Sequence, residues 1–160
     1  IEEHFHDVKE IWGAGQQQVR NVWSNIGCWH LNQWLHTLVE LASPRGAVQL
    51  MGHEIARATQ HVELIAPPDG CLALAPHLRR AASVGVTLDV ASTAAVPLGA
   101  IEVTTIPPPA WPGEPVLLVV DERAALIGSR DGERFSGHWG SGVAVVAAAR
   151  SVFAALKEGR

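Results

Sequence analysis

The stretch Glu114–Asp131, EPVLLVVDERAALIGSRD, decides the fold of this chain. Its apolar runs Val116–Val120 and Ala124–Ile127 are separated by the polar segment Asp121-Glu122-Arg123. Two short runs of β-branched and apolar residues on either side of a polar turn predict a β-hairpin. Six residues follow Asp121 before the pair Gly128-Ser129. The predicted second strand therefore ends on this pair.

The remainder of residues 48–160 predicts alternating helices and strands, because apolar residues recur at helical spacing or in short runs bounded by Pro and Gly. Pro67-Pro68-Asp69-Gly70 and Pro107–Gly113 are predicted as loops, since proline cannot donate to a sheet ladder. The predicted helices cover residues 48–60, 72–83 and 148–157, and the predicted strands cover residues 62–66, 86–90, 101–106, 116–120, 124–127 and 142–147. This order predicts an α/β domain with a mixed sheet.

Residues 1–42 predict a helical extension rich in tryptophan, and Ser43–Gly46 marks its boundary with the α/β domain. Trp23, Trp29 and Trp34 offer more apolar area than three short helices need. Three interpretations stay open: packing onto the α/β domain, a dimer interface, or a wall of a ligand pocket.

The composition bears on the partners of the chain. Its net charge is −4 and its isoelectric point is near 6.0, whereas nucleic-acid binding requires a basic face. We therefore expect DNA contact only through a domain not present in this chain. No apolar run approaches the about 20 residues that span a bilayer, so no membrane partner is expected. The distant Cys28 and Cys71 form no disulfide framework, which is typical of a cytoplasmic protein.

Histidines near the N-terminus raise the question of a metal site. His4 and His6 point to opposite faces of a strand and diverge by about 200° on a helix. A zinc ion at Cys28 and His30 would need further ligands from elsewhere in the chain. We therefore expect neither a metal nor another cofactor.

The hairpin, together with residues 77–92, HLRRAASVGVTLDVAS, resembles the phospholipase D-like fold over about two-thirds of the chain. Active members carry His-x-Lys, four residues, Asp, six residues and Gly-Ser. Here Asp121 and Gly128-Ser129 are present, but Glu114 and Val116 occupy the His and Lys positions. Phosphodiester transfer in that family needs the histidine as nucleophile and a cation on the phosphate. The resemblance therefore implies the fold without that activity, and the chain is not expected to be an enzyme.

Non-catalytic versions of this fold serve as effector-binding domains of TrmB-type transcription regulators. Residues 137–156, GHWGSGVAVVAAARSVFAAL, are similar to the Trp-containing segment and terminal helix of those domains. This resemblance implies a domain that senses a small-molecule effector, such as a sugar or an aromatic metabolite. It also implies a homodimer and a DNA-binding part elsewhere in the protein.

Several side chains of the α/β domain are candidates for holding the effector. Arg130 follows a strand end and could hold a carboxylate or phosphate, or could be a solvated loop arginine. A flat indole beside an imidazole, as in His138-Trp139, suits a sugar face or an aromatic ring, although this tryptophan could equally fill the edge of the core. The expected ligand pocket comprises Asp69, Trp111, Glu114, Ser129, Arg130, His138 and Trp139.

Two other functional classes stay open. The first is an enzyme on a degenerate phospholipase D-like scaffold that uses Glu114 or His138 as acid or base. The second is a non-catalytic protein that sequesters a ligand or acts only through interactions. Asp121 is expected to form the hairpin turn rather than to catalyse.

Overall fold

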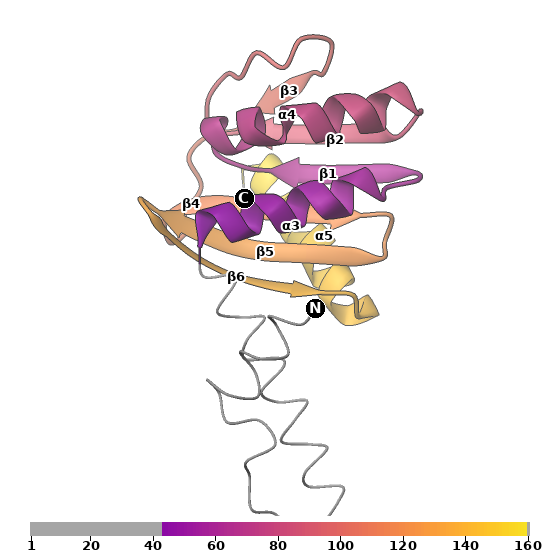
Figure 1. Cartoon of the computed structure of the whole chain (residues 1–160). Coiled ribbons are helices and arrows are strands. Elements are labelled where there is room, and N and C mark those ends of the chain that lie inside the picture. The colour runs from indigo at the N-terminus through magenta and orange to yellow at the C-terminus, as the bar shows by residue number, and fades with distance from the viewer. Residues whose placement is uncertain (1–42, 160) are drawn as a thin grey trace, which may run out of the picture. The chain divides into compact units, whose positions relative to one another are not determined.

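Three helices and six strands follow one another over residues 43–159, the part of the chain that the computed structural model describes (Figure 1). In chain order they are α3 (Pro44–Ala56), β1 (His61–Ile65), α4 (Pro68–Ser83), β2 (Thr87–Ser92), β3 (Val103–Thr105), β4 (Glu114–Val120), β5 (Ala124–Asp131), β6 (Arg134–Gly140) and α5 (Val143–Lys157). The expectations for residues 1–42, including the role of Trp23, Trp29 and Trp34, lie outside the described residues.

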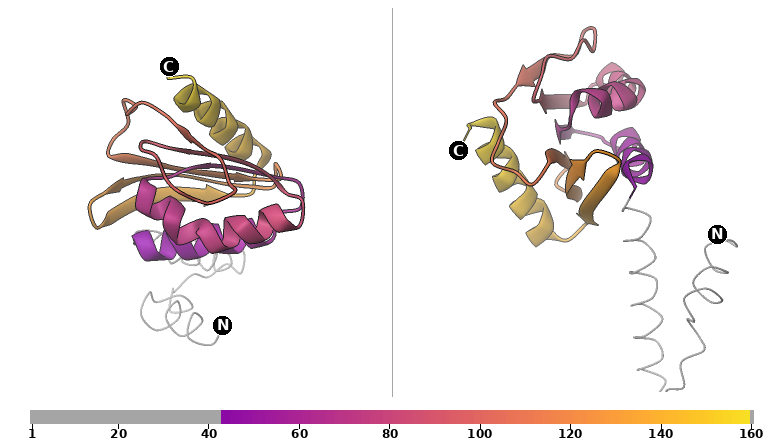
Figure 2. Two further views of the ribbon diagram at one scale, coloured as in Figure 1. Left: turned by 90° about the horizontal axis from the view of Figure 1, so that it is seen from above. Right: turned by 90° about the vertical axis from the view of Figure 1, so that its left-hand side faces the viewer.

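The six strands form one mixed sheet in the order β3-β2-β1-β4-β5-β6. On one side of β1 the strands β2 and β3 run parallel to it. Helix α4 forms the crossover from β1 to β2, whereas β2 and β3 are joined by a segment without a helix. On its other side β4 pairs antiparallel to β1, and β4, β5 and β6 form an antiparallel meander. Helices α3 and α4 cover one face of the sheet and α5 covers the other (Figures 1 and 2). The predicted α/β class with a mixed sheet is confirmed.

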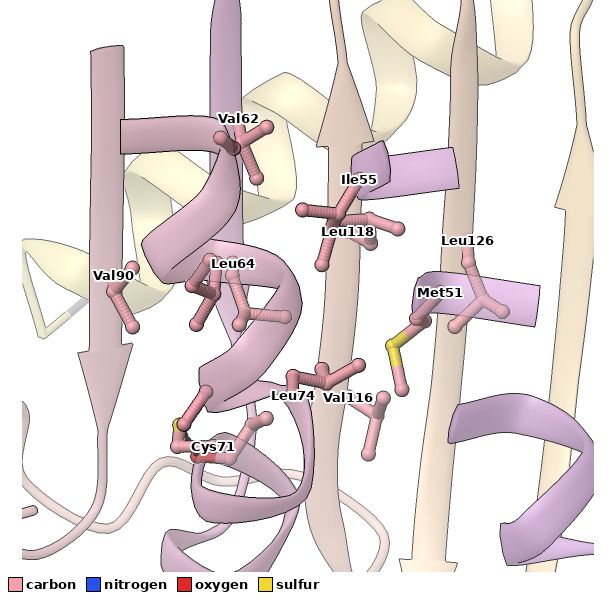
Figure 3. Packing of buried hydrophobic residues seen from close by; sticks show 14 of the residues in the cluster. Met51, Ile55, Val62, Leu64, Cys71, Leu74, Val90, Val116, Leu118 and Leu126 are labelled. Atoms are coloured by element: carbon pink, nitrogen blue, oxygen red, sulfur yellow. Dashed lines mark hydrogen bonds between the residues drawn. The ribbon is translucent and has the colours of Figure 1, made fainter. Parts of the chain in front are cut away.

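Alternation along β4 divides its side chains between the two faces. Val116, Leu118 and Val120 belong to the core between the sheet and the helices α3 and α4 (Figure 3). Leu117 and Val119 belong to the clusters beneath α5. Because both faces of this strand are covered, it reads as a continuous apolar run rather than as an alternating one.

The prediction of a last strand over residues 142–147 is wrong, because these residues open helix α5 instead. The buried residues of α5 are Val146, Ala149, Phe153 and Leu156, and their spacing of three or four residues is helical. The last strand is β6, which the sequence analysis missed because it contains two glycines. Both predicted helices that precede a strand also start earlier than expected, at Pro44 and Pro68, because proline suits the first turn of a helix.

The turn between β4 and β5 has left-handed backbone at two successive residues and is closed by a backbone hydrogen bond. Asp121 and Glu122 both adopt positive φ angles, of 51° and 55°, and Arg123 N donates to Val120 O at 2.8 Å. Left-handed backbone at both central positions suits the twist of a β-hairpin. The predicted hairpin is thus present, with longer strands than the apolar runs alone indicated.

Candidate functional site

A three-residue ion cluster lies where β5 ends, β4 begins and α4 starts. Glu114 and Arg130 are opposite each other in the β4–β5 ladder, and Asp69 belongs to the first turn of α4. The Arg130 guanidinium donates from Nε to Glu114 Oε2 at 2.8 Å and from Nη2 to Asp69 Oδ1 at 2.8 Å. Its Nη1 also donates to Asp69 Oδ2. The structure therefore brings together three residues of the predicted pocket.

The charges of this cluster limit what it can bind. The hydrogen bond from Arg130 holds the pKa of Asp69 below its usual range, although partial burial opposes the shift. The same bond raises the pKa of Arg130 further above its ordinary value, so Asp69 and Arg130 are both ionised at neutral pH. Two carboxylates facing one guanidinium leave a net charge of −1, which disfavours phosphate and favours neutral hydroxyl groups.

The cluster is accessible from solvent. The side chains of Asp69 and Glu114 are 66% and 43% exposed, whereas Arg130 is 21% exposed. The carboxylates thus keep acceptor positions that are open to a ligand, while the guanidinium is fixed between them.

An apolar pocket of about 30 Å³ lies beneath Arg130, between α3, the start of α4 and the sheet. Val116, which occupies the family's lysine position, is only 4% exposed and forms part of its wall. A lysine there would have to bury its ammonium group among apolar side chains. The other lining residues are Pro44, Ala47, Val48, Met51, Ala66, Pro67, Gly70, Arg130 and Phe135.

The other predicted pocket residues lie elsewhere, and the reason is strand alternation. Along β5, Ser129 points to the opposite face from Arg130, and along β6 His138 points to the opposite face from Phe135 and Trp139. Trp139 is on the face covered by α3 and α4, but it pairs with Leu126, which lies four residues along β5 from Arg130. The seven residues therefore do not line one pocket.

Trp111 also lies on the α5 side. It packs against the apolar cluster that contains Phe153 and Leu156, and its Nε1 donates to Gly128 O at 3.2 Å. These contacts make Trp111 part of the apolar packing beneath α5.

Asp121, the aspartate of the family pattern, lies in the hairpin turn and links this turn to the start of β1 by hydrogen bonds. Its Oδ1 accepts from Gln60 N at 2.9 Å and from His61 N at 2.8 Å. Its Oδ2 accepts from Thr59 N at 2.7 Å and from Thr59 Oγ1 at 3.0 Å. All of these partners belong to the protein, so the carboxylate has a structural role, as expected from its place in the turn.

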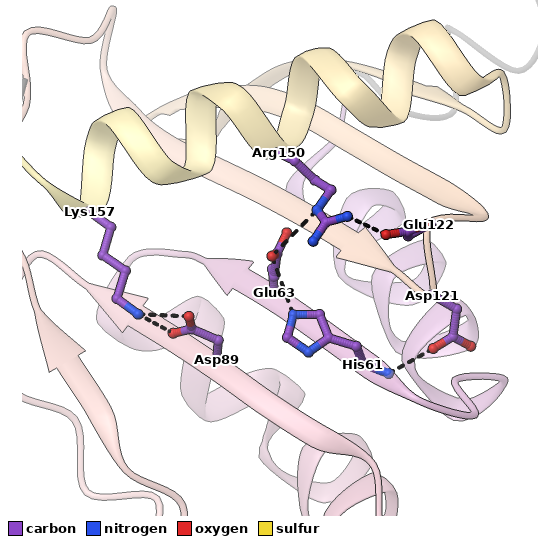
Figure 4. A network of polar contacts seen from close by, with 7 residues as sticks. All are labelled: His61, Glu63, Asp89, Asp121, Glu122, Arg150 and Lys157. Carbon is purple, nitrogen blue, oxygen red and sulfur yellow. Dashed lines mark hydrogen bonds and ion pairs between the residues drawn. The ribbon is translucent and has the colours of Figure 1, made fainter.

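Sequence reasoning missed a polar network between α5 and the sheet (Figure 4). Glu63, 9% exposed, lies 3.3 Å from His61 Nε2 and 3.7 Å from Arg150 Nε, both measured to its Oε1. Arg150 also pairs with Glu122, and Lys157 Nζ donates to Asp89 at 2.6 and 2.8 Å. The signal in the sequence was the spacing of Arg150 and Lys157, seven residues apart on one helix. Among the described residues, no group of three or more possible ligands is placed to hold a metal ion.

Solved structures define the class of this fold. Nuc from Salmonella typhimurium, a phospholipase D family member, is similar over 73% of this chain and 91% of its own, with a TM-score of 0.51 and 15% identity. NucT from Helicobacter pylori is similar over 72% of this chain and 89% of its own, with a TM-score of 0.50 and 12% identity. The described domain therefore has a phospholipase D-like fold.

A further similar structure is TrmBL2, an archaeal chromatin protein with a novel mode of DNA binding. Its TM-score is 0.57 at 13% identity, and the match covers 73% of this chain but only 50% of TrmBL2. The chain thus spans about half the length of that protein. The expected relation to both the phospholipase D-like and the TrmB-type fold is confirmed. No protein-family model matches the sequence, and no curated protein matches it. Within residues 43–159, no helix is long and apolar enough to cross a membrane.

Proposed function

We propose that residues 43–159 form a non-catalytic, ligand-binding domain of a DNA-associated regulator. The observation that carries this proposal is the Glu114–Arg130–Asp69 cluster, in which Glu114 occupies the position of the histidine of His-x-Lys in phospholipase D-like enzymes. The fold that the chain shares with TrmBL2 supports an association with DNA, and the absence of His-x-Lys argues against phosphodiester transfer. The homodimer implied by the resemblance to TrmB-type regulators is part of this proposal.

The geometry argues against the alternative of an acid–base enzyme. Glu114 is engaged by Arg130, and His138 points to the opposite face of the sheet. The two groups cannot act on one substrate, because an acid and a base must both be within hydrogen-bond reach of it. We expect the chain to show no hydrolysis of a chromogenic phosphodiester above the rate with buffer alone; turnover that depends on Glu114 would support the enzyme instead.

The chemistry of the cluster favours a neutral polyhydroxylated ligand, such as a sugar. A hydroxyl group can donate to Asp69 or Glu114 and at the same time accept from Arg130. The apolar pocket beneath Arg130 is too small for a sugar ring, at about 30 Å³, so such a ligand would lie over the exposed carboxylates rather than inside it. A phosphosugar is expected to bind more weakly, because the net charge of the cluster is negative.

Calorimetric titration with a panel of neutral sugars, polyols and phosphosugars tests this proposal. We expect saturable binding of a neutral compound, weakened at least about ten-fold in Arg130→Gln, since a charge-assisted hydrogen bond contributes about 1.5–3 kcal/mol. Asp69→Asn is expected to weaken the binding of the same compound, because the substitution removes an ionised acceptor.

The matched control is Lys157→Gln, which also breaks an ion pair but on the α5 side of the sheet. The affinity of this variant for the neutral compound is expected to equal that of the wild type. Circular dichroism shows that each variant is folded. Binding of a compound that is unaffected by both Arg130→Gln and Asp69→Asn would place the ligand elsewhere and contradict the proposed site.

A further inference from the structure

The basic residues of the described domain fall into two groups. Residues 43–159 contain nine Arg and Lys residues. Four of them are held by carboxylates: Arg123 by Glu54, Arg130 by Asp69 and Glu114, Arg150 by Glu63 and Glu122, and Lys157 by Asp89. Within the described part of the chain, no carboxylate pairs with the other five, which are Arg45, Arg57, Arg79, Arg80 and Arg134.

Four of these five unpaired arginines belong to the same layer of the fold. Arg45 lies in α3 and Arg57 is its C-cap, while Arg79 and Arg80 lie in α4. All four are exposed. The two helices lie side by side on one face of the sheet and run in the same direction (Figures 1 and 2). We call this surface, defined by Arg45, Arg57, Arg79 and Arg80, the basic helix face.

Among the described residues, no free carboxylate of α3 or α4 balances the basic helix face. Helices α3 and α4 contain two acidic residues, Glu54 and Asp69. Glu54 is 3% exposed and is bound by Arg123 at 2.8 Å, and Asp69 is bound by Arg130. An ordinary surface intersperses charges of both signs, so four unpaired arginines without an acidic neighbour mark a surface that faces a polyanion.

Helices α3 and α4, which carry the basic helix face, pack closely against each other. Gly52 of α3 lies directly under the His77 ring of α4, because a Cβ at Gly52 would stand 2.8 Å from His77 Nε2. This glycine allows the helices to approach each other closely. Two exposed histidines, His53 and His77, lie on the same two helices and add hydrogen-bond donors.

We propose that the basic helix face binds the phosphate backbone of double-stranded DNA without reading its sequence. Arginine matches phosphate in charge and in its planar array of donors. The similarity to TrmBL2 makes a duplex the polyanion of choice. The expectation that DNA contacts come only from outside this chain rested on its net charge of −4. That total hides the arrangement, because most of the paired carboxylates lie on the α5 side or at the Arg130 cluster.

The test is fluorescence anisotropy of the 160-residue chain with two labelled duplexes of unrelated sequence, over a series of salt concentrations. We expect binding to both duplexes at low salt and a loss of affinity as salt rises, since each neutralised phosphate contributes about −0.9 to the slope of log K against log salt. In the triple variant Arg57→Gln/Arg79→Gln/Arg80→Gln, the slope is expected to become shallower by about 2 to 3.

Arg134→Gln is the matched control, because it removes an unpaired, exposed arginine from β6 rather than from the helices. It is expected to leave the slope unchanged. Absence of duplex binding at low salt would overturn the proposal, and so would an unchanged slope in the triple variant. Stronger binding to vesicles rich in phosphatidylserine than to either duplex would assign the face to a membrane surface instead. Sugar binding at Arg130 is measured separately, so either proposal can fail alone.

Discussion

Alanine at Gly128 is expected to lower the free energy of unfolding by about 3 kcal/mol, as overpacking of a core does. The Phe135 ring lies over this glycine, and a Cβ there would stand 2.6 Å from Phe135 Cζ and 3.0 Å from Ser136 O. The ring cannot move away without leaving the core, where it is 5% exposed. Gly128 is the glycine of the family's Gly-Ser pair. Its presence in a chain without His-x-Lys is therefore explained by packing.

Gly137 is under the same constraint from the neighbouring strand. It pairs with Gly128 in the β5–β6 ladder, and its Cβ would stand 2.6 Å from the same ring. We expect Gly137→Ala to destabilise the domain by a similar amount. The double variant is expected to lose less unfolding free energy than the sum of the two single losses, because one displacement of Phe135 relieves both clashes.

Chemical denaturation monitored by circular dichroism measures these effects. The matched control is Gly70→Ala in α4, where the new Cβ would meet Ala66 Cβ at an ordinary 3.5 Å. Alanine is favoured over glycine in a helix by up to about 1 kcal/mol, so the control is expected to gain stability. A loss below about 1 kcal/mol in Gly128→Ala would show that the ring is not held as described.

Replacing Asp121 by alanine is expected to cost about 2–3 kcal/mol, since hydrogen bonds to a charged group are the strong ones. The substitution removes four acceptor contacts and leaves the amides of Thr59, Gln60 and His61 without their partner. Asp121→Asn keeps one side-chain oxygen as an acceptor and is expected to lose less stability than Asp121→Ala. Asp131→Ala, at an exposed aspartate that ends β5, is the control and should change stability by less than about 0.5 kcal/mol.

The contribution of Asp121 depends on pH in a defined direction. Partial burial alone would raise its pKa, but hydrogen bonds from His61, Thr59 and Gln60 outweigh it and hold the pKa below the ordinary 3.8. The folded state therefore binds this proton less readily than the unfolded state, and the stabilisation is complete above about pH 4. It disappears as the pH falls through the lower, folded-state value. We expect the stability difference between wild type and Asp121→Ala to shrink as the pH falls below about 4, and a difference that grew on acidification would contradict this.

Much of the fold could be predicted because its core strands are short apolar runs between strong turn signals. β6 and the start of α5 could not. Two glycines in Arg134–Gly140 weaken the strand pattern, and only the folded structure shows that Phe135 covers one of them. The Val-rich start of α5 has high strand propensity, yet its buried positions have helical spacing. Tertiary packing decided both cases.

The candidate site was predicted in part for a similar reason. Glu114 and Arg130 belong to one hairpin, so hairpin register places them together, and Asp69 joins them across the sheet. Ser129 was included as the neighbour of Arg130 and His138 as the neighbour of Trp139, but strand alternation sends both side chains to the other face. The basic helix face had no signal in the total charge, because that total does not show which carboxylates are already bound.

Contacts between neighbouring strands of the sheet differ in their sequence separation, because the strand order is not the chain order. The meander of β4, β5 and β6 uses neighbouring segments, and such local contacts form with little loss of chain entropy. The seam between β1 and β4 joins distant segments; the Asp121–His61 hydrogen bond at its end closes a loop of 60 residues. Closing that loop must precede the gain from the seam, so we expect β1–β4 docking to be the slow step of folding. Asp121, which fastens the end of this seam, then acts mainly on how slowly the completed sheet comes apart.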